Sequence, residues 1–94
     1  MSDTPVKDNW TVYIIKCGDG TYYTGISNDV SRRLEEHKAG KGAKYLRGRG
    51  PLKVVFQEAA GTHGSALQYE IKIKKLSRSK KEELISNPSL FKKL

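Results

Sequence analysis

The sequence has one cysteine and no long apolar run, and each shortage excludes a class of protein. Cys17 has no second cysteine to pair with, so neither an intramolecular disulfide nor a cysteine-based zinc site can form, which is typical of a reducing cytoplasm. No apolar stretch approaches the ~18 residues needed to cross a bilayer, and the first nine residues lack the apolar centre of a signal peptide. We therefore expect a cytoplasmic protein that does not act at a membrane.

Acidic residues are also scarce. The chain has ten Asp and Glu against eighteen Lys and Arg, a net charge of +8, and no acidic residue lies between Glu36 and Glu58. Excess positive charge raises the local concentration of polyanions and speeds their encounter with the protein. The sequence therefore predicts a nucleic-acid partner, with DNA favoured over RNA. Candidate contacts come from two basic clusters: Lys41, Lys44, Arg47, Arg49, Lys74 and Lys75.

The chain of 94 residues is long enough for one small domain and too short for two. We expect a flexible lead-in at 1–8, a single domain over 9–87 and a basic C-terminal tail at 88–94. Two runs rich in β-branched and aromatic residues, 10–17 and 21–26, flank a Gly-Asp-Gly turn. This pattern predicts a β-hairpin at the start of the domain.

The rest of the domain reads as three helices and one more strand. The first helix begins at a cap provided by Asn28 or Asp29 and ends at Gly40, and a glycine-rich basic loop follows. A third strand at 52–58 is expected to place Leu52, Val54 and Phe56 on one face. Two further helices follow, one over 65–76 and one from Ser77 or Ser79 to about 87. The predicted fold is α+β, a three-stranded antiparallel sheet flanked by helices in the order β-β-α-β-α-α.

Glu70 is the most informative residue for function, because it lies in or beside the apolar stripe of the second predicted helix. A carboxylate there needs a cation, either a basic side chain or a divalent metal ion, unless it reaches water at the edge of the core. His63, just before this helix, has no partner at a telling spacing and is expected in a loop. The spacing alone leaves these alternatives for Glu70 open.

Arg33 and His37 are four residues apart, so they share one face of the first helix and border its apolar stripe. Arginine suits a phosphate because its planar fork donates two hydrogen bonds and keeps its charge. The same pair also suits an ordinary helix surface. Tyr13 on the first strand would meet Tyr23 on the second if the turn has three residues, and Tyr22 if it has two.

These residues carry a resemblance to a known family. Thr11-Val12-Tyr13, then Tyr23-Thr24-Gly25, then Arg33, His37 and Glu70 in order resemble the GIY-YIG nuclease superfamily. The likeness covers roughly 10–86 and is strongest to its small stand-alone bacterial members. Thr and Val replace the first Gly and Ile of the name-giving motif, and Thr24 replaces an Ile. Larger members also use a downstream Asn, a role that we do not transfer to Asn87.

The resemblance implies a divalent-metal-dependent endonuclease that hydrolyses nucleic-acid phosphodiester bonds, of the kind used in DNA repair. Tyr13, Tyr23, Arg33 and His37 would be catalytic, and Glu70 would hold one Mg²⁺ or Mn²⁺. Two alternatives remain open at this point. The domain could bind nucleic acid without cutting it, or it could serve as an interaction subunit of a repair complex whose partner protein supplies specificity.

Overall fold

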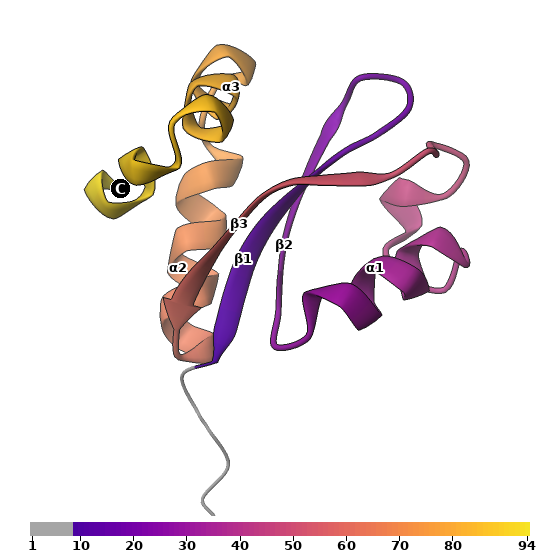
Figure 1. Ribbon diagram of the computed structural model, residues 1–94, viewed down its shortest axis with the longest axis horizontal. Helices are drawn as coiled ribbons and strands as arrows, with labels where there is room; N and C mark the ends of the chain where they lie inside the picture. Colours follow the sequence, from indigo (N-terminus) through magenta and orange to yellow (C-terminus); the bar gives the residue numbers. More distant parts are fainter. Residues whose placement is uncertain (1–8) are drawn as a thin grey trace, which may run out of the picture.

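The computed structural model describes residues 9–94, so the expected flexible lead-in lies outside the described residues. The expected element order is confirmed, with two short 3₁₀ helices added (Figure 1). The strands form an antiparallel sheet in the order β2-β1-β3. The elements are β1 (Trp10–Lys16), β2 (Tyr22–Ser27), α1 (Val30–Lys38), η1 (Lys44–Leu46), β3 (Lys53–Gly61), α2 (His63–Lys74), α3 (Arg78–Ser86) and η2 (Pro88–Lys93).

The hairpin register decides which tyrosine faces the first strand's Tyr13. Tyr13 lies opposite Gly25 and Ile15 opposite Tyr23, so odd-numbered residues of both strands share a face. The turn between the strands closes with a hydrogen bond from Cys17 N to the Thr21 carbonyl (2.8 Å). The three-residue turn is therefore the correct alternative, and Tyr23, not Tyr22, lies on the same face as Tyr13.

The third strand departs from the predicted alternation. Phe56 lies opposite Ile14, while Val54 lies opposite Ile15, because the pairing shifts register at that point. One extra residue on β3 reverses the side-chain direction beyond it. The expectation that Val54 and Phe56 share a face was therefore wrong.

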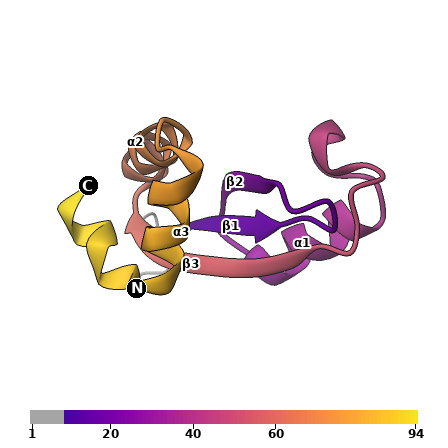
Figure 2. The ribbon, with the colours of Figure 1, turned by 90° about the horizontal axis from the view of Figure 1, so that it is seen from above.

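The sheet carries a separate hydrophobic core on each face. Figure 2 shows α2 and α1 to either side of the strands. The larger core joins the sheet to α2, α3 and η2 through Val12, Ile14, Phe56, Ala60, Ala66, Ile73, Leu84 and Phe91. The smaller core joins it to α1 and η1 through Tyr13, Ile15, Cys17 and Leu46, with Val30, Leu34 and Val54 packed around them. The candidate tyrosines thus lie on the α1 side of the sheet.

Side-chain caps set where the helices begin. Asp29 accepts a hydrogen bond from Arg32 N at the start of α1, and Ser77 accepts one from Lys80 N at the start of α3, which selects one of the two candidates that the sequence left for each cap. Thr62 caps α2 in the same way, so that helix begins at His63 and not at 65. His63 was expected in a loop; it lies in the first helical turn, with its ring centroid 4.5 Å from that of Trp10.

The expected C-terminal tail is part of the folded domain. Residues 88–93 form η2, and Phe91 is buried in the larger core with its ring centroid 4.2 Å from that of Tyr69. The packed part of the chain extends past the expected boundary at 87, because the apolar residues among these lysines pack onto the sheet. Within residues 9–94, no helix has the length and apolar character needed to span a bilayer.

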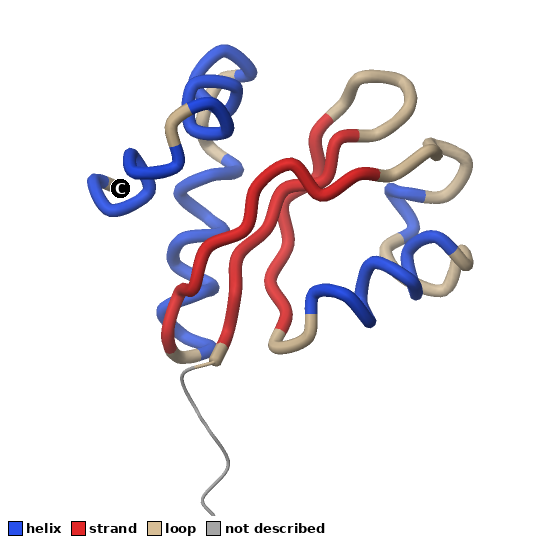
Figure 3. Tube along the Cα trace, viewed as in Figure 1, coloured by secondary structure: helices blue, strands red, loops and turns tan. Residues whose placement is uncertain are grey.

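Two loops at one end of the sheet are tied together, the hairpin turn and the segment before β3 (Figure 3). Gly18 N donates to the Arg49 carbonyl (2.6 Å), and Asp19 forms an ion pair with the Arg49 guanidinium (2.5 Å). A side chain at position 18 would collide with the Gly50 carbonyl, so glycine is needed for this approach. The basic loop after α1 is thereby held against the sheet.

Candidate active site

Tyr13 is almost fully buried, yet its ring reaches toward the edge of the sheet. Its partner across the hairpin is Gly25 on β2, which is an edge strand. A Cβ atom at position 25 would lie 2.6 Å from the Tyr13 hydroxyl, so only glycine leaves room for the ring to cross β2. The glycine of the Tyr23-Thr24-Gly25 triplet therefore positions Tyr13.

His37, in the last turn of α1, is 3% exposed and hydrogen-bonded at both ring nitrogens. Its Nε2 lies 2.9 Å from the Tyr13 hydroxyl oxygen, and its Nδ1 accepts from the backbone N–H of Ala43 (3.2 Å). Because Nδ1 is an acceptor, the neutral ring carries its proton on Nε2 and donates it to the Tyr13 oxygen. Burial, and then the charge of Arg33, lower the pKa of His37, which favours this neutral form.

Because its oxygen already accepts from His37, Tyr13 retains its own O–H to donate elsewhere. Burial, and then the neighbouring Tyr23, raise the pKa of Tyr13 to about 12. Two nearby charges act in opposite directions, since Arg33 lowers this pKa and Glu70 raises it. Charges on both α1 and α2 therefore act on the Tyr13 hydroxyl.

Arg33 presents its guanidinium beside Tyr13 from the preceding turn of α1. It forms an ion pair with Glu36 (3.0 Å), and both side chains are about 40% exposed. The hydrogen bond to Glu36 raises the pKa of Arg33, so the group stays charged. An ion pair this accessible contributes little stability, and a phosphate could replace Glu36 as the partner of Arg33.

Glu70 projects from α2, and its charge raises the pKa of Tyr13. Its side chain is 17% exposed and lies 3.4 Å from the ammonium of Lys74, which is itself 55% exposed. Within residues 9–94, no three His, Cys, Asp or Glu side chains gather into one metal-binding group. A cation here would therefore have fewer than three protein ligands of these types, which suits Mg²⁺ or Mn²⁺ because such ions keep several waters, and does not suit structural zinc.

Tyr23 extends the site along the surface. Its ring centroid lies 6.5 Å from that of Tyr13, 5.6 Å from that of His37 and 6.0 Å from that of Tyr45. The structure thus places Tyr13, Tyr23, Arg33 and His37 side by side, and Glu70 lies near enough for its charge to act on Tyr13. The structure also adds Tyr45, which sequence reasoning missed; an aromatic residue inside a basic, glycine-rich loop was the available signal.

The expected nucleic-acid contacts divide into two groups. Arg49 donates through Nε to the Tyr45 carbonyl (2.6 Å) and pairs with Asp19, so its guanidinium is committed to partners within the protein. Arg49 was expected to contact a phosphate; its guanidinium instead binds Asp19, because the loop before β3 and the hairpin turn lie side by side. The remaining candidates are exposed: Lys41, Lys44, Arg47, Lys74 and Lys75.

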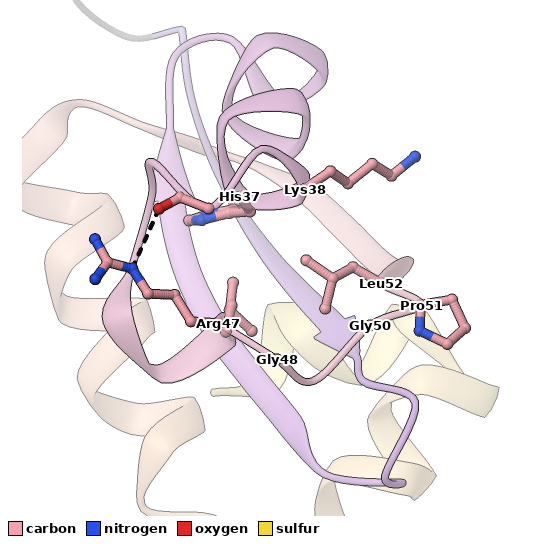
Figure 4. A pocket seen from close by; sticks show the side chains of 9 residues that line it. His37, Lys38, Arg47, Gly48, Gly50, Pro51 and Leu52 are labelled. Atoms are coloured by element: carbon pink, nitrogen blue, oxygen red, sulfur yellow. Dashed lines mark hydrogen bonds between the residues drawn. The ribbon is translucent and has the colours of Figure 1, made fainter.

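Two hollows flank the site. A cavity of about 410 Å³ lies between the end of α1 and the loop at 46–52, with His37 and Leu52 in its wall (Figure 4). Arg47 closes one side by donating through Nε to the Gly40 carbonyl (3.1 Å). This cavity contains neither Tyr13 nor Glu70. A second hollow, of about 310 Å³, is lined by Tyr22, Tyr23, Thr24, Tyr45, Lys74 and Lys81.

Comparison with known proteins identifies close relatives of known fold. A UPF0213 protein of Aeromonas hydrophila is 44% identical over 85 residues, which cover 90% of this chain and 62% of that protein, so the chain spans less than two thirds of that relative. The solution NMR structure of UPF0213 protein BH0048 from Bacillus halodurans is 49% identical, with 82% of each chain covered and a TM-score of 0.54. The solution NMR structure of protein EF2693 from E. faecalis is 35% identical, with 85% of each chain covered and a TM-score of 0.60.

The family match includes all five residues of the candidate site. Residues 9–83 match the GIY-YIG catalytic domain, a range that runs from the start of β1 into α3. Both motif tyrosines, the α1 pair of Arg33 and His37, and Glu70 all fall inside it. The chain therefore belongs to the GIY-YIG family.

Proposed function

We propose that the protein is a divalent-metal-dependent endonuclease that hydrolyses phosphodiester bonds in nucleic acid, with DNA as the first substrate to test. The observation that carries this proposal is the convergence at Tyr13, whose hydroxyl oxygen is held by His37 and is acted on by the opposite charges of Arg33 and Glu70. Packing alone gives no reason to place an arginine and a half-buried carboxylate beside one buried tyrosine.

Each candidate site residue has a separate role in the proposed reaction. Arg33 leaves Glu36 and neutralises charge that develops on the scissile phosphate. His37 orients Tyr13 through its Nε2–H. Tyr13 first releases its own proton to solvent, which requires its pKa to fall from the resting value of about 12, and the tyrosinate then takes the proton of the attacking water. Tyr23 lines the same surface and contacts the phosphate or the water.

Glu70 is the residue that would hold the cation, because its nearest cationic partner is an exposed lysine that can move away. When bound there, Mg²⁺ or Mn²⁺ would supply positive charge that stabilises the transition state and offsets the carboxylate charge that raises the pKa of Tyr13. Within residues 9–94, no three metal-binding side chains gather into one group, so Glu70 is proposed as a ligand that leaves most of the cation's coordination to water.

The test is cleavage of end-labelled single-stranded, duplex and branched oligonucleotides by the pure protein, with Mn²⁺ and with a chelator. We expect cleavage with Mn²⁺ only. Arg33→Ala should lower its rate on the order of a hundredfold while binding changes little, because Arg33 acts on charge developing in the transition state. Arg32→Ala is the matched control, because Arg32 is the exposed neighbour on the same helix.

A binding module without catalysis would give a different result in the same assay. It would bind the oligonucleotides through its lysines, and no product would form with either Mn²⁺ or Mg²⁺. Equal product in the presence of chelator, or equal rates for Arg33→Ala and Arg32→Ala, would also contradict the proposed mechanism.

A further inference from the structure

Tyr45 is an aromatic side chain that the protein holds in place without burying it. Its side chain is 44% exposed, although it lies on η1 next to Leu46, which is buried in the smaller core. Exposed aromatic residues usually gain little from being fixed, because burial of the ring is what offsets the loss of side-chain freedom. A fixed and exposed ring therefore indicates a contact made with something outside the domain.

A chain of polar contacts fixes the Tyr45 ring. The Arg49 guanidinium lies over the ring at 4.3 Å from its centroid and also donates to the Tyr45 carbonyl. Asp19 holds Arg49 from the hairpin turn and is itself held by the backbone N–H and the hydroxyl of Thr21. Those two hydrogen bonds from Thr21 are the main reason that the pKa of Asp19 is lowered, so its charge persists at neutral pH.

The ring lies directly beside the active site. Tyr45 and Tyr23 are nearly parallel, at 25° with centroids 6.0 Å apart, and Tyr23 in turn neighbours Tyr13. Both rings line the 310 Å³ hollow, whose other walls carry Lys74 and Lys81. The hollow thus has an aromatic side and a cationic side, and it starts at the residues that would contact the scissile phosphate.

We propose that this hollow holds an unpaired nucleotide next to the scissile phosphate, with its base stacked on the Tyr23 and Tyr45 rings and its backbone phosphates on Lys74 and Lys81. Lysines alone attract the backbone of any nucleic acid. Aromatic rings add affinity only where a base face is free, and in a continuous duplex both faces are covered by neighbouring bases. The substrate class is therefore single-stranded nucleic acid or a duplex unpaired at this nucleotide. This inference rests on the proposed function.

The test measures binding in the presence of chelator, so that no cleavage interferes. Fluorescence anisotropy would compare three probes with the same label: a single strand, the same strand with abasic sites at its centre, and the matching duplex. We expect the wild-type protein to bind the intact strand about tenfold more tightly than the abasic strand, because stacking adds affinity for each base engaged. This comparison needs no variant, so it remains decisive if a substitution affects folding.

Two substitutions then locate the effect. Tyr45→Ala should remove most of the difference between intact and abasic strands, and Tyr45→Phe should retain it because the ring is kept. Leu67→Ala is the control, as Leu67 is also an exposed apolar side chain but lies on α2, outside the hollow. Melting curves for all three variants would confirm that each is folded.

The outcomes separate this inference from the proposed function. Equal affinity of the wild type for intact and abasic strands, or an unchanged difference in folded Tyr45→Ala, would overturn the stacking site even if Mn²⁺-dependent cleavage is observed. A clear preference for the intact strand that disappears in Tyr45→Ala would support the site even if no cleavage occurs with any metal.

Discussion

The Nε2 of His37 and the hydroxyl oxygen of Tyr13 lie 2.9 Å apart, and this bond joins the last turn of α1 to the central strand β1. The opposite ring nitrogen accepts from Ala43 N, which determines the direction of the bond. One buried imidazole therefore links the basic loop after α1 to the residue at the centre of the candidate site.

The first prediction tests whether the proposed cleavage requires the hydroxyl group of Tyr13. Tyr13→Phe keeps the ring and removes the oxygen, so Mn²⁺-dependent cleavage should fall about a hundredfold or more. It also leaves the His37 Nε2–H without its partner, which should cost about 1–3 kcal/mol in the free energy of unfolding. The matched control is Tyr22→Phe, because Tyr22 lies on the other face and donates to Glu82. Equal cleavage by the two variants would contradict the role of Tyr13.

The second prediction concerns the close approach of the basic loop to His37. A Cβ atom at Gly42 would collide with the His37 ring at Nδ1, so Gly42→Ala must displace either the loop or the imidazole. We expect slower cleavage and a loss of about 1–3 kcal/mol in the free energy of unfolding, because crowding and a broken buried hydrogen bond act together. Gly64→Ala is the control, since a Cβ there meets nothing within 4 Å and should stabilise α2 by about 0.5–1 kcal/mol. Urea unfolding measures both.

The third prediction is a pH dependence of stability. Burial lowers the pKa of His37 below its ordinary value of 6.5 in the folded protein, so the unfolded chain binds a proton at a higher pH than the folded one. The stability that this group contributes is complete above about pH 6.5 and is lost as the pH falls toward the lowered pKa. Urea unfolding between pH 7 and pH 5 should show this loss, and His37→Phe should show a smaller slope than the wild type. Equal slopes for the wild type and His37→Phe would show that other titrating groups cause the loss of stability.

The fourth prediction tests Glu70 as the cation ligand. Glu70→Gln removes the charge at nearly constant size, so cleavage should be lost at any Mn²⁺ concentration. The melting temperature without metal should change by only a degree or two, because the partner lysine is more than half exposed and such pairs contribute about 0–1 kcal/mol. A pronounced fall in melting temperature would indicate that Glu70 is a structural ion-pair partner instead.

The fifth prediction concerns the exposed cations of the basic loop. If Lys44 and Arg47 contact backbone phosphates, affinity for duplex DNA should fall with salt at a slope of about −0.9 per phosphate neutralised. Replacing both by alanine should make this slope shallower by the equivalent of up to about two neutralised phosphates. Arg49 is excluded from this set because its guanidinium is paired with Asp19. An unchanged slope would show that the loop at 41–47 faces away from the bound nucleic acid.

Much of the fold follows from local patterns. The sequence narrowed the helix starts to Asn28 or Asp29 and to Ser77 or Ser79, because a capping side chain acts within three residues of itself. The face of Phe56 was not predictable, since it depends on where β3 shifts its pairing against Ile14, and that shift depends on both strands. The burial of Phe91 was missed for a related reason, because its partners lie on β3 and α2.

The sequence by itself determined the excess of positive charge, the order of the elements and the chemical types present at Tyr13, Arg33, His37 and Glu70, because each of these is a property of single residues or of short spacings. The tertiary structure decided that Tyr23 faces Tyr13, that His37 carries its proton on Nε2, and that Arg49 holds Tyr45 at the surface. Each of these depends on contacts between residues far apart in the chain. Their geometry exists only once the two cores have packed against opposite faces of the sheet.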